Sequence, residues 1–213
     1  MQVFSPQAVL ALKLATLAGV SFAILTAVAL YKFLPAPGGE LSPAQPIPFS
    51  HKHHVGDDGI DCRYCHDSVE KSSFAGIPSS QVCMTCHSQL FTDAPVLEPL
   101  RESARTGRPL QWIRVHKVPD FVFFDHSIHV AKGVGCVECH GRVDKMPRIR
   151  RVASLEMQWC LGCHRDPAPH LRPPAEVFDL ASPLPSAEVQ TSLMKTLHIA
   201  GTRRLTDCST CHR

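Results

Sequence analysis

The sequence lacks any run of lysine and arginine long enough to form a phosphate-binding patch. Its 213 residues contain 22 Lys and Arg against 19 Asp and Glu, so the formal net charge is only +3. Nucleic-acid-binding domains usually concentrate a strong positive charge on one face. So mild a balance gives no indication of a nucleic-acid partner, and we expect none. Proline, in contrast, is abundant, with 18 residues.

The sequence also lacks cysteine outside a single motif. Its ten cysteines form five C-x-x-C pairs, and a histidine directly follows every pair. A disulfide framework predicts no such rule, and a zinc site gives no reason for an adjacent histidine each time. C-x-x-C-H is the attachment signature of c-type haem. We therefore predict five covalently bound haem c groups, each with an iron. The attaching residues are Cys62 and Cys65, Cys83 and Cys86, Cys136 and Cys139, Cys160 and Cys163, and Cys208 and Cys211, and the iron-ligating histidines are His66, His87, His140, His164 and His212.

The spacing of the remaining histidines reveals an internal repeat. Phe-x-His-x-x-His precedes the first and third motifs, and its first histidine stands 11 and 10 residues before the next cysteine. A second motif follows after 21 residues in one repeat and 24 in the other, and His198 stands 10 residues before Cys208. A fixed order of spacings indicates repeated units. We expect one repeat at 49–90, a second at 112–166 and a half-module at 195–213.

The Phe-x-His-x-x-His segment before C-x-x-C-H resembles the small class III multihaem cytochromes. In that family the first histidine ligates the haem of its own module and the second reaches the next haem. Histidines three residues apart on a helical turn share one face, so one short segment could hold two haems. The resemblance implies that these histidines are the second iron ligands of the first four haems: His51 for the first motif, His54 for the second, His126 for the third and His129 for the fourth.

The second ligand of the fifth haem has three candidates. His198 has the offset of the repeat, and His116 lies in the phrase that precedes the second histidine pair. Met157 stands just before the fourth motif, and a thioether ligand raises the potential of a haem. We treat His53 and His170 as bystanders.

Charge is absent from residues 14–31, between Lys13 and Lys32. A bilayer core of about 30 Å needs roughly 20 apolar residues, so we expect a membrane anchor within 1–34, spanning about 9–32. A cleaved signal peptide with a site at 27–29 is the alternative, although the apolar stretch exceeds the usual signal core of roughly 7–15 residues. Haem attachment takes place outside the cytoplasm. We therefore expect a single-pass protein of the bacterial inner membrane with its haem domain, 49–213, on the periplasmic side.

Two segments are rich in proline. Residues 35–48 favour an extended spacer between anchor and haem domain. Residues 165–188 favour either a surface loop or a strap that docks along a partner subunit, and we expect the strap. Five haems in so short a domain leave little room for a sheet. The predicted fold is therefore mainly α with much irregular structure, a single N-terminal transmembrane helix and a multihaem cytochrome c domain organised around five haems.

Three further absences bear on function. No C-x-x-C is followed by the lysine that marks the catalytic haem of multihaem nitrite reductases, and no carboxylate or histidine lies in the apolar segment to take a quinol proton. The first motif is followed by HDSVEKSS, without the methionine of membrane-anchored tetrahaem quinol dehydrogenases. We expect an electron-transfer subunit that is not itself catalytic. A stand-alone membrane-anchored multihaem quinol dehydrogenase and a haem enzyme with an open coordination site remain the alternatives.

The anchor, the five motifs, RVHKVPDFVFFDHSIHV (114–130) and MQWCLGCH (157–164) together resemble the pentahaem cytochrome subunit of alternative complex III. The resemblance implies a respiratory or photosynthetic membrane complex that oxidises quinol, with a polytopic quinol-binding subunit and an iron–sulfur subunit as partners. Electrons would pass to a periplasmic cytochrome c, another small carrier or a terminal oxidase. The same phrase also resembles cytochromes of quinone reductase complexes, in which electrons run the opposite way.

Overall fold

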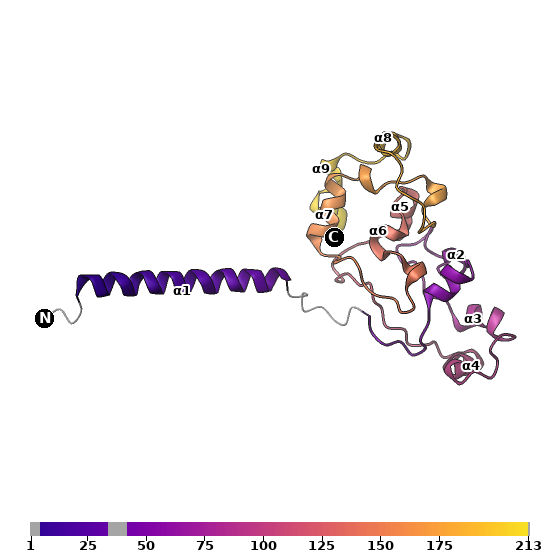
Figure 1. Cartoon of the computed structure of the whole chain (residues 1–213). Helices are drawn as coiled ribbons and strands as arrows, with labels where there is room; N and C mark the ends of the chain where they lie inside the picture. Colours follow the sequence, from indigo (N-terminus) through magenta and orange to yellow (C-terminus); the bar gives the residue numbers. More distant parts are fainter. Residues whose placement is uncertain (1–4, 34–41, 213) are drawn as a thin grey trace. The chain divides into compact units, whose positions relative to one another are not determined.

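The computed structural model describes residues 5–33 and 42–212, and the chain divides into two compact units, 1–40 and 41–213 (Figure 1). The first unit contains the helix α1, Pro6–Phe33, which is 28 residues long. A bilayer core is crossed by roughly 20 helical residues, so this helix is long enough to span one. Pro6–Leu30 is apolar enough to cross a membrane and none of it is buried within the chain. This helix is a candidate membrane anchor.

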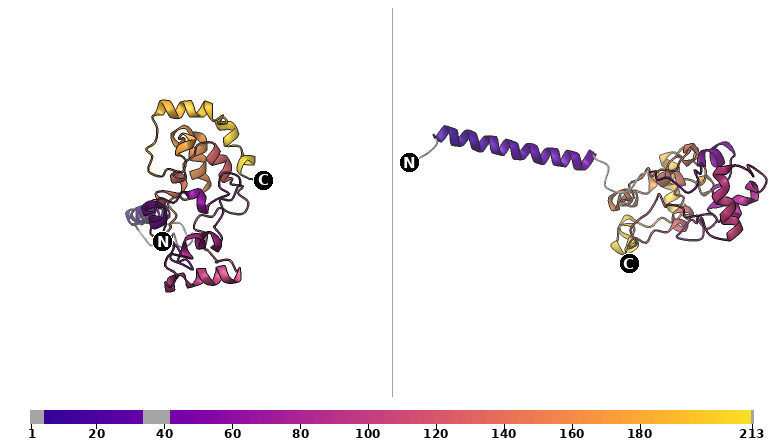
Figure 2. Two further views of the ribbon diagram at one scale, coloured as in Figure 1. Left: turned by 90° about the vertical axis from the view of Figure 1, so that its right-hand side faces the viewer. Right: turned by 90° about the horizontal axis from the view of Figure 1, so that it is seen from below.

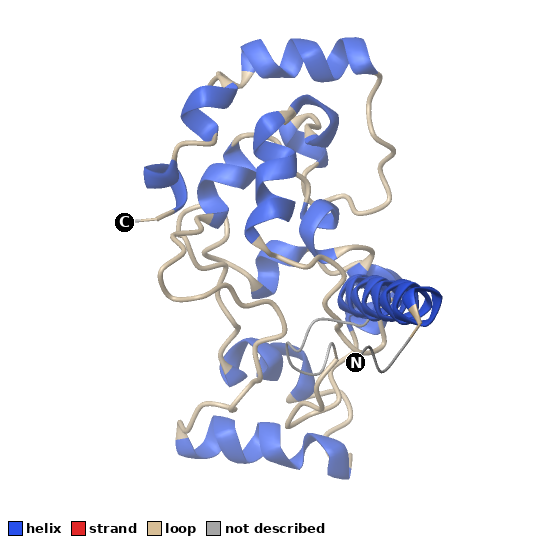
Figure 3. Cartoon of the chain, turned by 90° about the vertical axis from the view of Figure 1, so that its left-hand side faces the viewer, coloured by secondary structure: helices blue, strands red, loops and turns tan. Residues whose placement is uncertain are grey.

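The second unit is built from short helices joined by long irregular segments, and its described residues contain no strand (Figure 3). A single isolated bridge joins Val134 and Leu171. The mainly helical class predicted from the sequence is confirmed. The elements are the π-helix η1 (Lys52–Asp57), α2 (Cys62–Cys65), α3 (Ser80–His87), η2 (Pro95–Leu97), α4 (Glu98–Thr106), α5 (His126–Ala131), α6 (Cys136–His140), η3 (Val143–Lys145), α7 (Met157–Arg165), η4 (Ala168–His170), η5 (Pro174–Glu176), α8 (Ala187–Thr196), α9 (Thr202–Leu205) and α10 (Cys208–Cys211).

Aspartates start three of the helices that carry predicted haem-binding residues. The side chain of Asp61 accepts from the Arg63 amide, and that of Asp207 accepts from the Ser209 amide. Asp125 likewise accepts from the first amides of α5. An N-cap aspartate satisfies amides that have no partner inside the helix. These caps explain why α2, α10 and α5 begin directly at Cys62, Cys208 and His126.

The described side chains bury few apolar groups among themselves. α4 and α8 lie at opposite ends of the unit (Figure 2), and most of the chain between them is loop. Large apolar side chains near the motifs are exposed, among them Tyr64, Phe121 and Phe123. The buried apolar residues are Ile47, Val69, Leu100, Met146, Ala153, Leu171, Val177 and Leu180.

The proline-rich segment 165–188 contributes heavily to this small core. Leu171 and Val177 are each only 1% exposed, and Leu180 is buried as well. The amide of Cys136 donates to the carbonyl of Val177 at 3.1 Å. The segment therefore packs into its own chain at these residues, and docking of its exposed part along a partner stays a prediction. Proline spacing alone gave no signal of these buried apolar side chains.

The predicted spacer, 35–48, lies partly outside the described residues. From residue 42 onward the chain belongs to the second unit and contacts the rest of it. The Ser42 hydroxyl donates to the Ile149 carbonyl at 2.9 Å, and the Gln45 side chain exchanges two hydrogen bonds of 2.9 Å with the backbone of Ile113. Because Ile47 is buried too, residues 42–48 are held by specific contacts.

A glycine contact between η1 and η3 supports a stability prediction. A Cβ built on Gly56 would overlap the backbone carbonyl of Asp144. A backbone carbonyl cannot rotate away as a side chain can. We therefore expect Gly56→Ala to destabilise the unit by about 1–3 kcal/mol, the usual cost of overpacking. Thermal unfolding of the purified chain measures this change. Gly201→Ala is the matched control, since no atom lies within 4 Å of its added Cβ, and equal losses in both variants would contradict the prediction.

Candidate haem attachment and ligand sites

The five C-x-x-C-H motifs all lie on short helices. In each motif the two cysteines are three residues apart on one helical face, and the histidine lies in the last turn of the helix or directly follows it. All ten cysteines are described, and none forms a disulfide. Among the described residues, no group of three or more His, Cys, Asp or Glu side chains is arranged to hold a bare metal ion. The cysteines and histidines therefore fit a cofactor that bonds to the two thiols at its edge and to the imidazole through its metal, as haem c does. The helices are α2, α3, α6, α7 and α10.

Backbone carbonyls orient the imidazoles of four of these five motifs. In each case Nδ1 lies within hydrogen-bond distance of a carbonyl oxygen, which can only accept. Nδ1 must then carry the proton, and Nε2 keeps a lone pair for iron, as is usual for metal-ligating histidines. The pairs are His66 with Gly76 (2.7 Å), His87 with Leu90 (3.2 Å), His164 with Leu205 (3.0 Å) and His212 with Phe121 (3.2 Å).

The first Phe-x-His-x-x-His segment packs its rings in a defined way. The Phe49 ring stacks on His54 with centroids 4.4 Å apart and meets His51 edge-on at 4.9 Å. Nδ1 of His54 lies 2.9 Å from the carbonyl oxygen of Ser50, which stands four residues earlier.

The second such segment repeats this geometry. The Phe124 ring stacks on His129 at 4.6 Å and meets His126 edge-on at 4.7 Å. Nδ1 of His129 lies 2.6 Å from the carbonyl oxygen of Asp125, again four residues earlier. The repeat read from sequence spacing is thus a repeat of local structure, although one copy is the π-helix η1 and the other is α5.

Three of the predicted second ligands face the imidazole of the predicted motif. A metal–imidazole nitrogen bond is about 2 Å and a ring centre lies roughly 1 Å beyond the nitrogen, so two opposing ligands have centres roughly 6 Å apart. The three pairs have this separation: His54 and His87 at 6.2 Å, His129 and His164 at 6.2 Å, and His126 and His140 at 6.4 Å.

The fourth predicted second ligand, His51, is half-buried beside the first motif. Burial, followed by the fields of His66, His54 and His116, lowers the pKa of His51 to about 4. The ring is therefore neutral at pH 7, as a metal ligand must be. Its Nδ1 is buried and has no hydrogen-bond partner among the described residues.

The three candidates for the fifth haem lie in different surroundings. The ring centre of His116 is only 4.3 Å from that of His140, too close for opposing ligands on one iron, and its buried Nε2 has no partner among the described residues. His198 has a left-handed backbone, with φ 50°. Met157 is 59% exposed. Within the described part of the chain, none of the three makes a ring contact or hydrogen bond with His212, whose ring instead stacks on Phe121 at 5.8 Å.

Direct contacts place the first motif next to the second and the fourth next to the fifth. The hydroxyls of Tyr64 and Thr85, inside the first and second motifs, are 2.7 Å apart. At the other end of the unit, the fourth-motif residue His164 is bonded to Leu205, and the Thr202 hydroxyl donates to the Arg165 carbonyl at 3.2 Å.

Contacts also place the third motif near the first and the fourth. The amide of Cys136 donates to the carbonyl of Val177 at 3.1 Å, and the guanidinium of Arg63, inside the first motif, lies 4.5 Å from the ring centre of the adjacent Phe178. The third and fourth motifs both lie beside α5, whose His126 and His129 have ring centres 6.4 Å from that of His140 and 6.2 Å from that of His164. These contacts link the motifs in the order 83–87, 62–66, 136–140, 160–164 and 208–212.

Sequence reasoning missed a charged cluster at the third motif. The Glu138 carboxylate, between Cys136 and Cys139, accepts from Nδ1 of His170 at 3.0 Å and lies 3.4 Å from Nη2 of Arg172. His170 is thus a specific partner of the third motif, and the expectation that it does not ligate iron stays a prediction. These contacts join residues far apart in the sequence, and no local spacing signals them.

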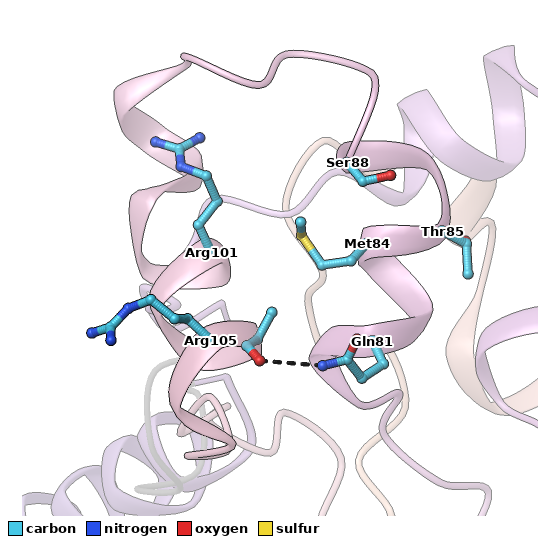
Figure 4. Close-up of a pocket in the computed structure, with 7 residues that line it drawn as sticks. Gln81, Met84, Thr85, Ser88, Arg101 and Arg105 are labelled. Carbon is cyan, nitrogen blue, oxygen red and sulfur yellow. Dashed lines mark hydrogen bonds between the residues drawn. The ribbon is translucent and has the colours of Figure 1, made fainter.

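A surface cavity of about 630 Å³ lies between α3 and α4 (Figure 4). Met84 on α3 points toward α4, and Gln81 Nε2 donates to the Ala104 carbonyl at 3.3 Å across the gap. Arg101 and Arg105 line the other wall, paired with Glu98 and Glu102. The lining is Gln81, Met84, Thr85, Ser88, Arg101, Ala104 and Arg105. These described residues include no histidine or carboxylate that could act as a general base.

The comparisons with known proteins agree with this geometry. The family model for cytochrome c7 and related cytochrome c matches residues 47–103 and 122–213, which include all five motifs. The chain is also 37% identical over 125 residues to the protein named "Menaquinone reductase, multiheme cytochrome c subunit" of Nitratidesulfovibrio vulgaris. That match covers 58% of this chain and 53% of the relative, so the chain spans about half the length of that protein. The chain belongs to the family of cytochrome c7 and related cytochrome c, multihaem electron-transfer proteins with covalently bound haem c.

Proposed function

We propose that this chain is the five-haem electron relay of a quinone-linked membrane complex. The observation that carries the proposal is the contiguous order of the five motifs, combined with imidazole pairs that face each other across three of them. Opposing imidazoles leave no coordination position for a substrate, so such sites favour electron transfer over catalysis. The relay would run between the motif at 83–87 and the motif at 208–212.

In this proposal the chain's own residues hold and orient the prosthetic groups. Bound haem supplies one-electron redox chemistry at each site. The cysteines would attach it. His66, His87, His140, His164 and His212 would ligate its iron, with His51, His54, His126 and His129 as the second ligands. Carbonyl groups such as those of Ser50 and Asp125 keep the proton on Nδ1. For the fifth haem we propose His198, because His116 lies beside His140 instead.

Quinone chemistry is assigned to a partner subunit. The described anchor helix contains neither carboxylate nor histidine, and its charged residues are Lys13 and Lys32. It therefore offers no group to exchange the protons of a quinol. We propose a polytopic quinone-binding subunit and an iron–sulfur subunit as neighbours, with the haem unit on the periplasmic side of the inner membrane. A soluble carrier or an oxidase would be the other redox partner.

The direction of electron flow distinguishes two forms of the proposal. The resemblance to alternative complex III favours quinol oxidation, whereas the name of the relative favours electron delivery to menaquinone. Stopped-flow spectroscopy of the intact complex separates them. Haem reduction by a quinol analogue supports the first form, and haem oxidation by a quinone analogue after prior reduction supports the second.

We expect the chain to carry five haems and to copurify with stoichiometric partners when it is isolated from its native membrane in mild detergent. Intact-mass spectrometry should give the polypeptide plus five haem masses, because every C-x-x-C-H helix presents two thiols and an imidazole. Peptide mass spectrometry of the same preparation should identify polytopic and iron–sulfur companions.

Two results would contradict the proposal. Fewer than five attached haems would break the relay at a missing motif. Recovery of the chain alone, with oxidation of a quinol analogue by the chain itself, would favour a stand-alone quinol dehydrogenase.

A further inference from the structure

An ion pair between a buried arginine and a partly buried carboxylate lies at the middle of the proposed relay. Arg172, 1% exposed, places Nη2 3.4 Å from Oε1 of Glu138, whose side chain is 19% exposed. The other oxygen of Glu138 accepts from Nδ1 of His170 at 3.0 Å. Glu138 stands between the two attachment cysteines of the third motif. A fully buried arginine is rare unless it is paired, and this one is paired with the motif itself.

The backbone around the third motif holds the guanidinium in place. The Arg172 amide donates to the Gly133 carbonyl at 2.9 Å, and Nη1 lies 3.4 Å and 3.3 Å from the carbonyl oxygens of Asp179 and Ser182. A Cβ on Gly135 would lie 2.5 Å from Arg172 Nε. Glycine directly before Cys136 therefore makes room for the cation.

The charges of this pair are only partly cancelled. The contact between Arg172 and Glu138 is long at 3.4 Å, and Arg172 Nε is buried without a partner among the described residues. Charges removed from water are weakly screened.

We propose that Arg172 and Glu138 set the reduction potential of the haem attached at Cys136 and Cys139, by opposing buried charges. The inference depends on the proposed function in one respect only: a haem must be attached at Cys136 and Cys139. Reduction adds one electron to the iron, so a nearby cation stabilises the reduced form and raises the potential. A nearby carboxylate does the reverse. Charge and hydrogen bonding near a redox centre are recognised means of tuning potential.

The test is a mediated redox titration of the purified full-length protein, followed by electron paramagnetic resonance. The signal of the third-motif haem is the one missing from a variant with both Cys136 and Cys139 replaced by alanine. We expect its midpoint potential to shift downward in Arg172→Gln and upward in Glu138→Gln. Arg172→Lys, which keeps the charge, should return the potential toward the wild-type value.

Opposite shifts separate a charge effect from loosened structure. A loosened site would admit water around the haem and move both variants in the same direction, which would overturn the inference, as would an unchanged potential in both. If Arg172→Gln does not fold, Glu138→Gln alone decides: an upward shift of the midpoint potential supports the inference, and a downward shift or no shift overturns it. Arg63→Gln is the matched control: Arg63 pairs with Asp61 beside the first motif, but its side chain is 48% exposed, so water screens it and little shift is expected.

The titration also separates this inference from the proposed function. Chemical mediators replace the quinone and the soluble partner, so a chain that relays nothing to a quinone would still show the opposite shifts. Unchanged potentials in a complex that still relays electrons would overturn the charge-setting role alone.

Discussion

Replacement of His126 by alanine is expected to leave five haems attached and to convert one of them from low spin to high spin. The two cysteines of the third motif are untouched, so attachment persists. The substitution removes the imidazole whose ring centre lies 6.4 Å from that of His140, so we expect one iron to lose its second ligand. Electron paramagnetic resonance of the oxidised protein should show a new high-spin signal and the loss of one low-spin signal.

His53→Ala is the matched control for this variant. His53 also lies in a Phe-x-His-x-x-His segment, but it is exposed and lies near Asp57 and Asp58 on the surface, with contacts of 3.9 Å and 3.6 Å. Its replacement should leave the spectrum unchanged. An unaltered spectrum in His126→Ala would refute the ligand assignment, and a high-spin signal in both variants would indicate general disturbance of the fold.

Replacement of both Cys136 and Cys139 by alanine is expected to divide the relay into two parts. The third motif lies between the first and the fourth: Cys136 bonds to Val177 beside Phe178, which the first-motif residue Arg63 contacts, and α5 lies beside both the third and the fourth motifs. Electron transfer falls steeply with distance, so a missing central haem should stop exchange between the two sides. In the intact complex, stopped-flow reduction should leave a subset of haems oxidised over the time in which the wild type is fully reduced.

The same double replacement at Cys83 and Cys86 tests whether position matters. That motif is at one end of the order, next to the first motif through Tyr64 and Thr85. Four contiguous sites remain in this variant, and they should still exchange electrons with one another. Equal effects of the central and terminal variants would contradict a linear order.

The sequence predicted the local features of the sites well. The motifs, the two Phe-x-His-x-x-His segments and their helical turns are each encoded within a few residues. Capping aspartates at 61, 125 and 207 reinforce them. The pairing of His54 with His87 and of His129 with His164 followed from the repeat and the resemblance, and both pairs have the expected ring separation.

Long-range packing could not be predicted in the same way. The segment 165–188 has the composition of a linker, yet Leu171, Arg172 and Val177 are its most buried residues. The partner of Arg172 on the third motif is far away in the sequence, so no periodicity links the two. The environment of His198 likewise depends on how α8 and α9 pack, and the sequence offset between His198 and Cys208 contains none of that information.

The hydrogen bonds that orient the histidines have a consequence for how the protein is made. His126 Nδ1 is held by the carbonyl of Ser73, which belongs to the first repeat, and His212 Nδ1 by the carbonyl of Phe121, which belongs to the second. Both of these imidazoles are thus oriented by backbone from another repeat, whereas His54 and His129 are oriented by backbone of their own. On the proposed function, haem attachment would therefore begin on a chain whose ligands are not yet all fixed, and ligation by these two histidines would require both repeats to be present. A single repeat, cut from this chain, would keep its cysteines but lose the backbone that orients some of its histidines.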